Sequence, residues 1–354
     1  MQDPEVQPDA QPVPATVALP AKPRSLSKPF NRAGAPSIAD LGFDAQQGEL
    51  ADDDTGQQAS ASQNDMIGFP GERVPHISFG FEGERWRIRN VAWVIGQSET
   101  GQQILDYTNR AGYRIGFDSM TSTGEKLECY TNLTDKVITL DGRANTEQLV
   151  VMLTYSLGLA AGGIDGLFFD SSMHPPAALL ANRMAGAYAL ALQLQVCHEL
   201  RTAKTLPESS DREVYWRQVA KEHSRLSSAF AQTAINDMAI SQGAAMAAAI
   251  REFYDHKGLR ERYDIEVVNY YRALPAGLLK DPKAMIAGFD PGAQAFKLKF
   301  PGLTYALNHE PKLDLKAPVN IAASAAIAEA VAALQVARRN AGVKDREPWH
   351  VQTV

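Results

Sequence analysis

The sequence predicts an α+β protein, in which a small sheet with helices precedes a mainly helical C-terminal half. Stretches with strand character lie between residues 113 and 142, whereas long apolar helical stretches dominate after residue 175. The chain has 354 residues, of which 45% are hydrophobic. It is therefore long enough for one large domain or two ordinary ones.

Residues 1–65 are rich in Pro, Gln, Asp, Ala and Ser, and they follow neither a helical nor a strand period. Such a segment cannot bury enough apolar surface to offset chain entropy, so we expect a disordered arm. The arm lacks the apolar core of a signal peptide, and no run of about 18 apolar residues predicts a membrane span. Cys129 and Cys197 are far apart and indicate no disulfide framework. A cytoplasmic location is the default expectation.

The first predicted elements are a short helix and strands. Ser98 is a suitable helix N-cap and Gly112 a suitable C-terminal stop, and residues 113–118 read as a strand. Residues 127–142 predict two more strands joined by a turn at residues 132–135. We expect the second of these, "KVITLDG" at 136–142, to form an edge of the sheet.

The stretch "LVVMLTYSLGLAAGG" at 149–163 predicts a buried central helix. Asn145 or Thr146 can cap it, and Gln148 completes a capping box with Asn145. A helix that is apolar nearly all round has no face for solvent, so it belongs in the core.

The remaining chain is mainly helical. Residues 175–204 form a long apolar helix with proline at its start, and residues 211–256 supply two or three further helices. Residues 263–274 and 321–340 are also predicted helices. Residues 297–320 read as irregular extended chain.

Several segments occur in an order that resembles a known bacterial family. They are "GQSETGQQILDYTNRAGYRIGFD", "ITLDGRANTEQLVVMLTYSLGLAAGG", "LLANRMAGAYALALQLQVCHEL" and "AAMAAAIREFYDH", followed by "RYD" at 262–264. Together they resemble zinc metallopeptidase domains whose function is otherwise unassigned. The likeness spans roughly residues 90–265. It implies a zincin-like domain over residues 66–265, with residues 266–354 as a helical C-terminal extension.

In that family the central helix carries His-Glu-x-x-His, and a later helix carries Glu-Ala-Asp-Ala shortly after an arginine. Here Tyr155, Ser156 and Leu159 stand at the positions of the first histidine, the glutamate and the second histidine. Gly186 and Tyr188 replace the glutamate and the aspartate of the later helix. The resemblance therefore implies a degenerate site without its metal ligands.

Arg183 lies within an apolar helix, so if it is buried it needs a partner. We expect it to act as a structural pin, bonded to Tyr155 or to an acidic residue. A second place to look for zinc is His198 and Glu199, which begin a His-Glu-x-x-His pattern, but Thr202 takes the place of the second histidine. The simpler interpretation is an exposed helix end.

Three hypotheses about function remain. The first is a non-catalytic pseudo-metallopeptidase that binds a protein or peptide, with strand 136–142 as the edge for strand addition. The second is an active zinc-dependent metallopeptidase built on His198 and Glu199, and the third is a structural protein of a larger assembly. The net charge of −6 gives no basic field for nucleic acid. We expect no cofactor, with zinc required only by the second hypothesis.

Overall fold

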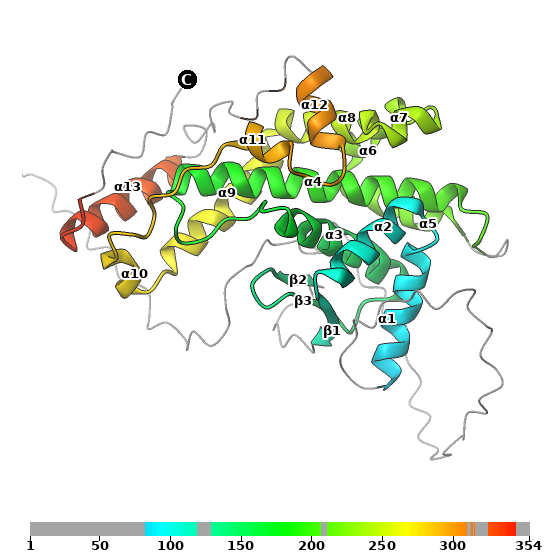
Figure 1. The fold of residues 1–354 in the computed structure, drawn as a ribbon, viewed down its shortest axis with the longest axis horizontal. Helices are drawn as coiled ribbons and strands as arrows, with labels where there is room; N and C mark the ends of the chain where they lie inside the picture. Colours follow the sequence, from blue (N-terminus) through cyan, green and yellow to red (C-terminus); the bar gives the residue numbers. More distant parts are fainter. Residues whose placement is uncertain are drawn as a thin grey trace, which may run out of the picture. The chain divides into compact units, whose positions relative to one another are not determined.

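The computed structural model describes residues 82–118, 129–206, 211–309, 313, 315 and 325–344. The predicted disordered arm at residues 1–65 lies outside these ranges. The described chain combines one small sheet with a majority of helices (Figure 1). This arrangement confirms the predicted α+β class.

The sheet has three short strands: β1 (Arg114–Asp118), β2 (Cys129–Asn132) and β3 (Val137–Asp141). Their order is β1-β3-β2, with β1 parallel and β2 antiparallel to β3. The expectation that strand 136–142 forms an edge is therefore wrong, because β3 is the central strand. The hairpin turn between β2 and β3 is local and was predicted. The strand that pairs in parallel with β3 is β1, which precedes the hairpin in the sequence. No turn motif predicts this pairing.

Two helices precede and flank the sheet, α1 (Glu82–Ile95) and α2 (Glu99–Arg110). The Ser98 side chain accepts a hydrogen bond from the Gly101 amide, as expected of an N-cap. Gly112 follows the end of α2 with φ of 84°, a conformation that glycine adopts without steric cost. The predicted helix-then-strand segment is confirmed.

Helix α3 (Thr146–Ile164) lies between the sheet and the long helix α4 (Figure 1). Asn145 and Gln148 form the predicted capping box, and every residue from Leu149 to Gly162 is buried. Among the described helices, α3 alone is long and apolar enough to cross a membrane, and 78% of that span is buried inside the fold. A core helix of a soluble protein meets the same criteria.

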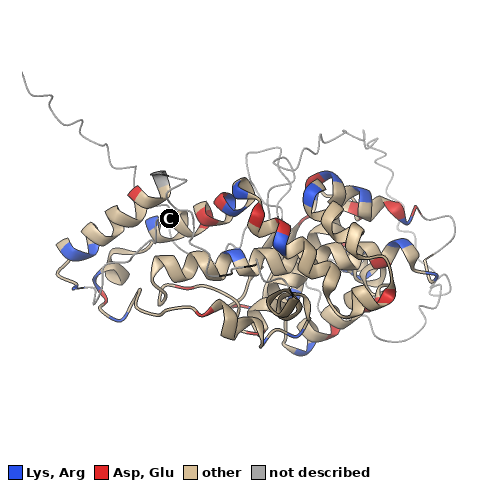
Figure 2. Ribbon diagram, turned by 90° about the horizontal axis from the view of Figure 1, so that it is seen from above, with Lys and Arg blue, Asp and Glu red and all other residues tan. Residues whose placement is uncertain are grey.

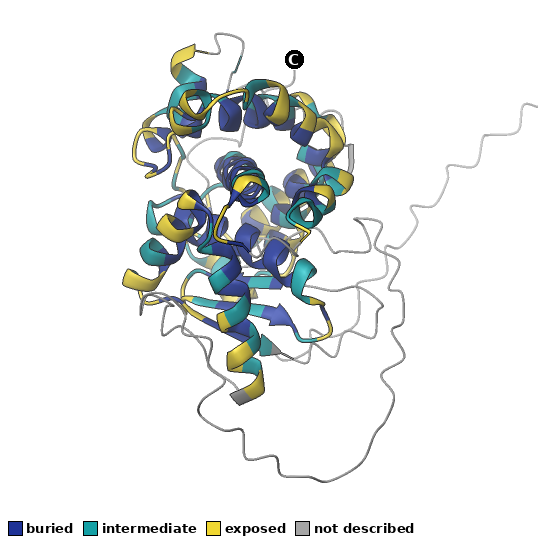
Figure 3. Ribbon diagram, turned by 90° about the vertical axis from the view of Figure 1, so that its right-hand side faces the viewer, coloured by how far each residue is buried: buried dark blue, intermediate teal, exposed yellow. Residues whose placement is uncertain are grey.

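Helix α4 (Pro175–Thr202) contributes the largest share of buried residues. Its charged residues are Arg183, Glu199 and Arg201 alone, so most of its ribbon is uncharged in Figure 2. Figure 3 looks along the direction of α4 and shows buried residues concentrated there, with exposed residues on the surrounding helices. Side chains that α4 presents to its neighbours therefore lie in the core.

Helices follow one another in the rest of the described chain. They are α5 (Glu213–Glu222), α6 (Ser224–Thr233), α7 (Asp237–Ser241), α8 (Ala244–Asp255), α9 (Lys257–Arg272), α10 (Ala276–Lys280), α11 (Pro291–Ala295), α12 (Gly302–His309) and α13 (Ala325–Asn340).

Two sequence-based expectations concern this half of the chain. Residues 297–320 are not wholly irregular, because α12 forms where Leu303 and Ala306 are buried and Gly302 packs against Met246 of α8. A tertiary contact has overridden weak local helix signals. The expected boundary between residues 265 and 266 falls inside the continuous helix α9.

Candidate functional site

Tyr155 stands where the resemblance implies the first zinc-binding histidine, and its side chain reaches from α3 to α9. Its hydroxyl oxygen lies 2.9 Å from the hydroxyl oxygen of Tyr263, and both side chains are buried. We call these two residues the tyrosine pair. Burial, with smaller effects from Tyr263 and Glu266, raises the pKa of Tyr155 well above its usual value. Both hydroxyls therefore keep their protons at neutral pH, and one donates to the other.

Gly186 on α4 packs against the ring of Tyr263. A Cβ atom added at Gly186 would lie 2.2 Å from Cε1 of that ring, 2.5 Å from Cζ and 2.7 Å from Cδ1. Real Cβ atoms essentially never approach a heavy atom within 3.0 Å, so no larger residue fits unless the ring moves. Positions 155 and 186 thus converge on the same tyrosine, although they lie on different helices.

The ring of Tyr263 is held from several sides. Its centroid is 5.3 Å from that of Phe253 in an edge-to-face arrangement, a favourable geometry for aromatic rings. The Asn182 amide of α4 donates to the carbonyl of Tyr263 at 2.7 Å. Because both the side chain and the backbone of Tyr263 are anchored, its ring cannot easily retreat from Gly186.

Arg183 is buried and forms an ion pair with Asp264, the residue that follows Tyr263. Its Nε donates to Oδ1 at 2.5 Å, and its Nη2 donates to Oδ2 of the same carboxylate. Burial raises the pKa of Asp264, and the hydrogen bonds and charge of Arg183 oppose that rise. The acidic partner of the arginine is therefore Asp264 of α9, whereas Tyr155 bonds elsewhere. This bidentate pair ties α9 to α4 beside the tyrosine pair.

The other positions at which the resemblance implies site residues are also buried. Among the described residues, the Ser156 hydroxyl has no hydrogen-bond partner, and Leu159 is 3% exposed. The Tyr188 hydroxyl accepts a hydrogen bond from the Phe300 amide at 3.3 Å, away from the tyrosine pair. Burial raises the pKa of Tyr188 well above its usual value. The structure thus brings positions 155 and 186 together but directs the Tyr188 hydroxyl elsewhere.

The residues at these positions do not suit a zinc ion. Zinc in proteins is bound by thiolate, imidazole or carboxylate groups. Leu159 and Gly186 have no donor atom, and Tyr155 and Tyr188 keep protonated hydroxyls in other hydrogen bonds. Within the described ranges, moreover, no group of three or more His, Cys, Asp or Glu residues is placed to hold a metal ion.

His198 and Glu199 occupy the last turns of α4 and contact different helices. The His198 ring packs against Trp216 of α5 and Phe230 of α6, with centroid distances of 5.6 and 5.5 Å. Burial, and then Arg201, lower the pKa of His198. The structure does not direct this imidazole and the Glu199 carboxylate at a common point.

The Glu199 carboxylate caps helix α2. It accepts hydrogen bonds from the Thr100 amide at 2.8 Å and from the Thr100 hydroxyl at 2.6 Å. Gln195 donates to the same carboxylate at 3.1 Å. A carboxylate at a helix N-terminus satisfies free amides and interacts favourably with the helix dipole. Glu199 therefore has a complete structural role.

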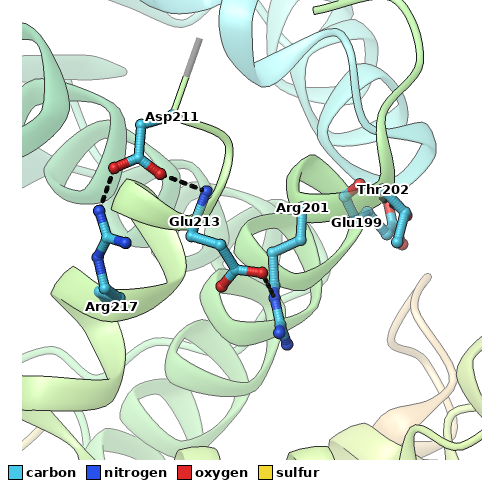
Figure 4. Close-up of polar contacts among 6 residues, drawn as sticks. All are labelled: Glu199, Arg201, Thr202, Asp211, Glu213 and Arg217. Atoms are coloured by element: carbon cyan, nitrogen blue, oxygen red, sulfur yellow. Dashed lines mark hydrogen bonds and ion pairs between the residues drawn. The ribbon is translucent and has the colours of Figure 1, made fainter. Parts of the chain in front are cut away.

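The end of the His-Glu-x-x-His-like pattern is shown in Figure 4. The Thr202 hydroxyl donates to the Glu199 carbonyl at 3.1 Å, and Arg201 forms an ion pair with Glu213 at 2.9 Å. Beyond this pair, Asp211 bonds to Arg217 and to the Glu213 amide. These are surface interactions of a helix end, and none of them orients a metal ligand.

Tyr263 is the central residue that the sequence analysis did not single out. It lies 108 residues after Tyr155 in the chain. No spacing rule connects residues so far apart. The one available signal is the Gly186 substitution, since a glycine inside a long helix indicates close approach by another group.

Comparison with known proteins adds one finding. Residues 107–275, a little under half of the chain, match the family described as "Putative metallopeptidase family (DUF6782)". The matched segment begins in α2 and ends after α9, so it contains the tyrosine pair, Gly186 and the Arg183–Asp264 pair. No curated protein and no solved structure shows a significant match to the chain.

Proposed function

We propose that the chain, through residues 107–275, is a non-catalytic member of this metallopeptidase family. One observation carries the proposal. Two of the positions at which the resemblance implies zinc ligands, 155 and 186, meet at the ring of Tyr263. If the resemblance places a metal between these two positions, the packed ring of Tyr263 occupies that space.

The chemistry of the remaining groups supports the same proposal. Metal-assisted hydrolysis needs a bound, activated water and a general base close to it. Ser156 stands at the position of the base, and a serine hydroxyl is a poor base without a partner that takes its proton. Its hydroxyl is buried and has no partner among the described residues. Among the described residues, the positions that the resemblance assigns to the ligands and the base therefore offer no group that supports this reaction.

We further propose that the domain binds a protein or peptide partner and uses no cofactor. The strand-addition groove along residues 136–142 is not available for this, because β3 has strands on both sides. Apolar surface supports another location. Ile235 is 79% exposed and Met238 is 61% exposed, three residues apart where α6 leads into α7. Neighbouring exposed apolar side chains are typical of interaction surfaces, whereas single ones are common everywhere.

Zinc affinity tests the non-catalytic proposal. We expect the wild type to bind no zinc at about micromolar concentration in competition with a coloured chelator. The restoring variant combines Tyr155→His, Ser156→Glu, Leu159→His and Gly186→Glu with Tyr263→Ala. The last change is required because any Cβ at position 186 meets the tyrosine ring. This variant should gain zinc affinity, since three protein ligands and a water make a zinc site.

A matched control keeps Leu159 in the otherwise identical variant, which leaves two protein ligands and should bind zinc much more weakly. The opposite result would favour the active-enzyme hypothesis. In that case the wild type would bind stoichiometric zinc, and His198→Ala would abolish both the zinc and a zinc-dependent hydrolysis.

The partner proposal has its own test. A protein captured by the wild type should be lost with the double change Ile235→Lys and Met238→Lys, and it should be retained with Ile265→Lys. Ile265 is an exposed isoleucine on another helix.

A further inference from the structure

Helix α4 begins at a histidine that acts as its cap. The Nδ1 atom of His174 accepts a hydrogen bond from the Ala177 amide at 3.1 Å, and His174 has the extended backbone of an N-cap residue. An imidazole nitrogen accepts only when it carries no proton. We propose that His174 is an acid-sensitive cap, whose protonation opens the first turn of α4 and releases the segment 284–288 that packs against it.

The first turn of α4 has one backbone amide that depends on the His174 side chain. The first two helical residues are Pro175 and Pro176, which have no amide hydrogen, and the Ala178 amide already bonds to the His174 carbonyl. Ala177 therefore carries the one amide in the first turn that needs a side-chain acceptor. If Nδ1 carried a proton, two hydrogen-bond donors, this nitrogen and the Ala177 amide, would face each other. The imidazolium would also place a positive charge at the positive end of the helix dipole.

Other parts of the fold depend on this helix start. The His174 amide donates to the Ala287 carbonyl at 3.0 Å, and Met173 pairs with Ala287 in an isolated bridge. The Tyr271 hydroxyl of α9 donates to the Met173 carbonyl at 2.6 Å. The helix start, the 284–288 segment and α9 thus meet at residues 173 and 174.

An apolar cluster lies behind this junction and would gain solvent access if it opened. The cluster joins the first turns of α4 to α9, the 284–288 segment and α13, and its buried members include Ala178, Leu179, Ala181, Val267, Val268, Met285 and Ile327. It is separate from the larger core that contains the tyrosine pair. Acid release of the segment would therefore expose a new apolar surface while leaving the tyrosine pair in place.

The charged side chains on the adjoining elements have hydrogen-bond partners other than His174. The Asp170 carboxylate bonds to Ser172, and the Asp281 carboxylate accepts from the Lys283 amide. The Arg338 guanidinium of α13 donates to backbone carbonyls of residues 279, 281 and 284. From α9, the titratable Tyr271 and Tyr270 face this region, and Tyr271 donates to backbone carbonyls.

Burial lowers the pKa of His174, so the cap weakens as the pH falls. A lowered pKa means that the unfolded or opened state takes up the proton more readily than the capped state. The capped state is thus fully favoured at neutral pH, and the preference is lost as pH falls below about 6.5, the ordinary histidine value.

Amide hydrogen exchange tests the proposal on the whole chain. Between pH 7.5 and pH 5.0, the protection factors of the Ala177 and Ala178 amides should fall by about tenfold, which corresponds to the loss of a cap of ordinary size. In His174→Asn, a good cap that does not titrate, protection should stay constant over this range. In His174→Ala it should be low at both values.

His256 offers a matched control, since its Nδ1 caps α9 in the same way by accepting from the Leu259 amide at 3.1 Å. His256→Asn should leave the pH response of Ala177 unchanged. The proposal is overturned if the wild type keeps its protection at pH 5.0, or if His174→Asn loses protection as the wild type does. The asparagine variant decides the matter even if the alanine variant does not fold.

Discussion

Gly186→Ala is the most direct test of the packing at the candidate site. Replacing glycine by alanine inside a helix ordinarily stabilises a protein by about 0.5–1 kcal/mol. Here the new Cβ would lie 2.2 Å from Cε1 of Tyr263, so the ring must shift or the helices must separate. Overpacking of this kind costs about 1–3 kcal/mol, and loss of the hydrogen bond to Tyr155 adds about 1 kcal/mol. We therefore expect a net loss of about 1–3 kcal/mol in the free energy of unfolding.

The assay is urea unfolding followed by circular dichroism, with the free energy taken from midpoint and slope. Gly162→Ala is the matched control: its added Cβ would meet its nearest neighbours at 3.4–3.6 Å, an ordinary contact distance. That change should be neutral or slightly stabilising. Combining Gly186→Ala with Tyr263→Ala should cost less than the sum of the two single changes, because the second removes the atoms that the first strikes. A neutral or stabilising Gly186→Ala would refute the close-packed tyrosine pair.

Two further predictions concern buried charge. Burial, with smaller effects from Arg262 and His256, lowers the pKa of His223 to about 4. Stability from this group is present above about pH 6.5 and is lost as pH falls through 4, to a total of about 3 kcal/mol at most. The difference in unfolding free energy between wild type and His223→Gln should therefore change over this range, and a constant difference would contradict the assignment. Asp264→Asn should cost about 3–5 kcal/mol because it leaves the Arg183 charge buried and poorly paired. Arg183→Met with Asp264→Leu should cost less than the two single changes added together, as a double-mutant cycle would measure.

The parts of the fold that are local in sequence could be predicted from it. The caps at Ser98 and Asn145 depend on residues within one helical turn, and the β2–β3 hairpin depends on a four-residue turn. The strand order could not be predicted, since the parallel pairing of β1 with β3 joins segments more than twenty residues apart in sequence. Helix α12 was missed for a similar reason, because burial against α8 rather than local propensity stabilises it.

The candidate site was predictable only where the resemblance supplied positions. It indicated residues 155, 159 and 186, and the structure places two of these against one tyrosine. Chemistry alone suggested that Arg183 needs a partner if buried, but it could not choose Asp264 from among many acidic residues. Tyr263 itself carried no signal, because a tyrosine in an amphipathic helix is an ordinary core residue.

The contacts of Gly186 bear on the proposal of a degenerate site, because a ligand at this position conflicts with Tyr263. With Tyr263 in place, any side chain at position 186 meets the tyrosine ring, so Gly186→Glu alone introduces a clash before it introduces a ligand. With Gly186 in place, removing the Tyr263 ring leaves a cavity beside Tyr155 and an unpaired buried hydroxyl, each of which costs stability. Changing either Gly186 or Tyr263 alone therefore lowers the stability of the fold. Under the proposal of a degenerate site, restoring a ligand at position 186 requires both residues to change together, in addition to placing histidines on α3. This mutual dependence is a physical reason, independent of the resemblance, to treat positions 155 and 186 as part of a packed core.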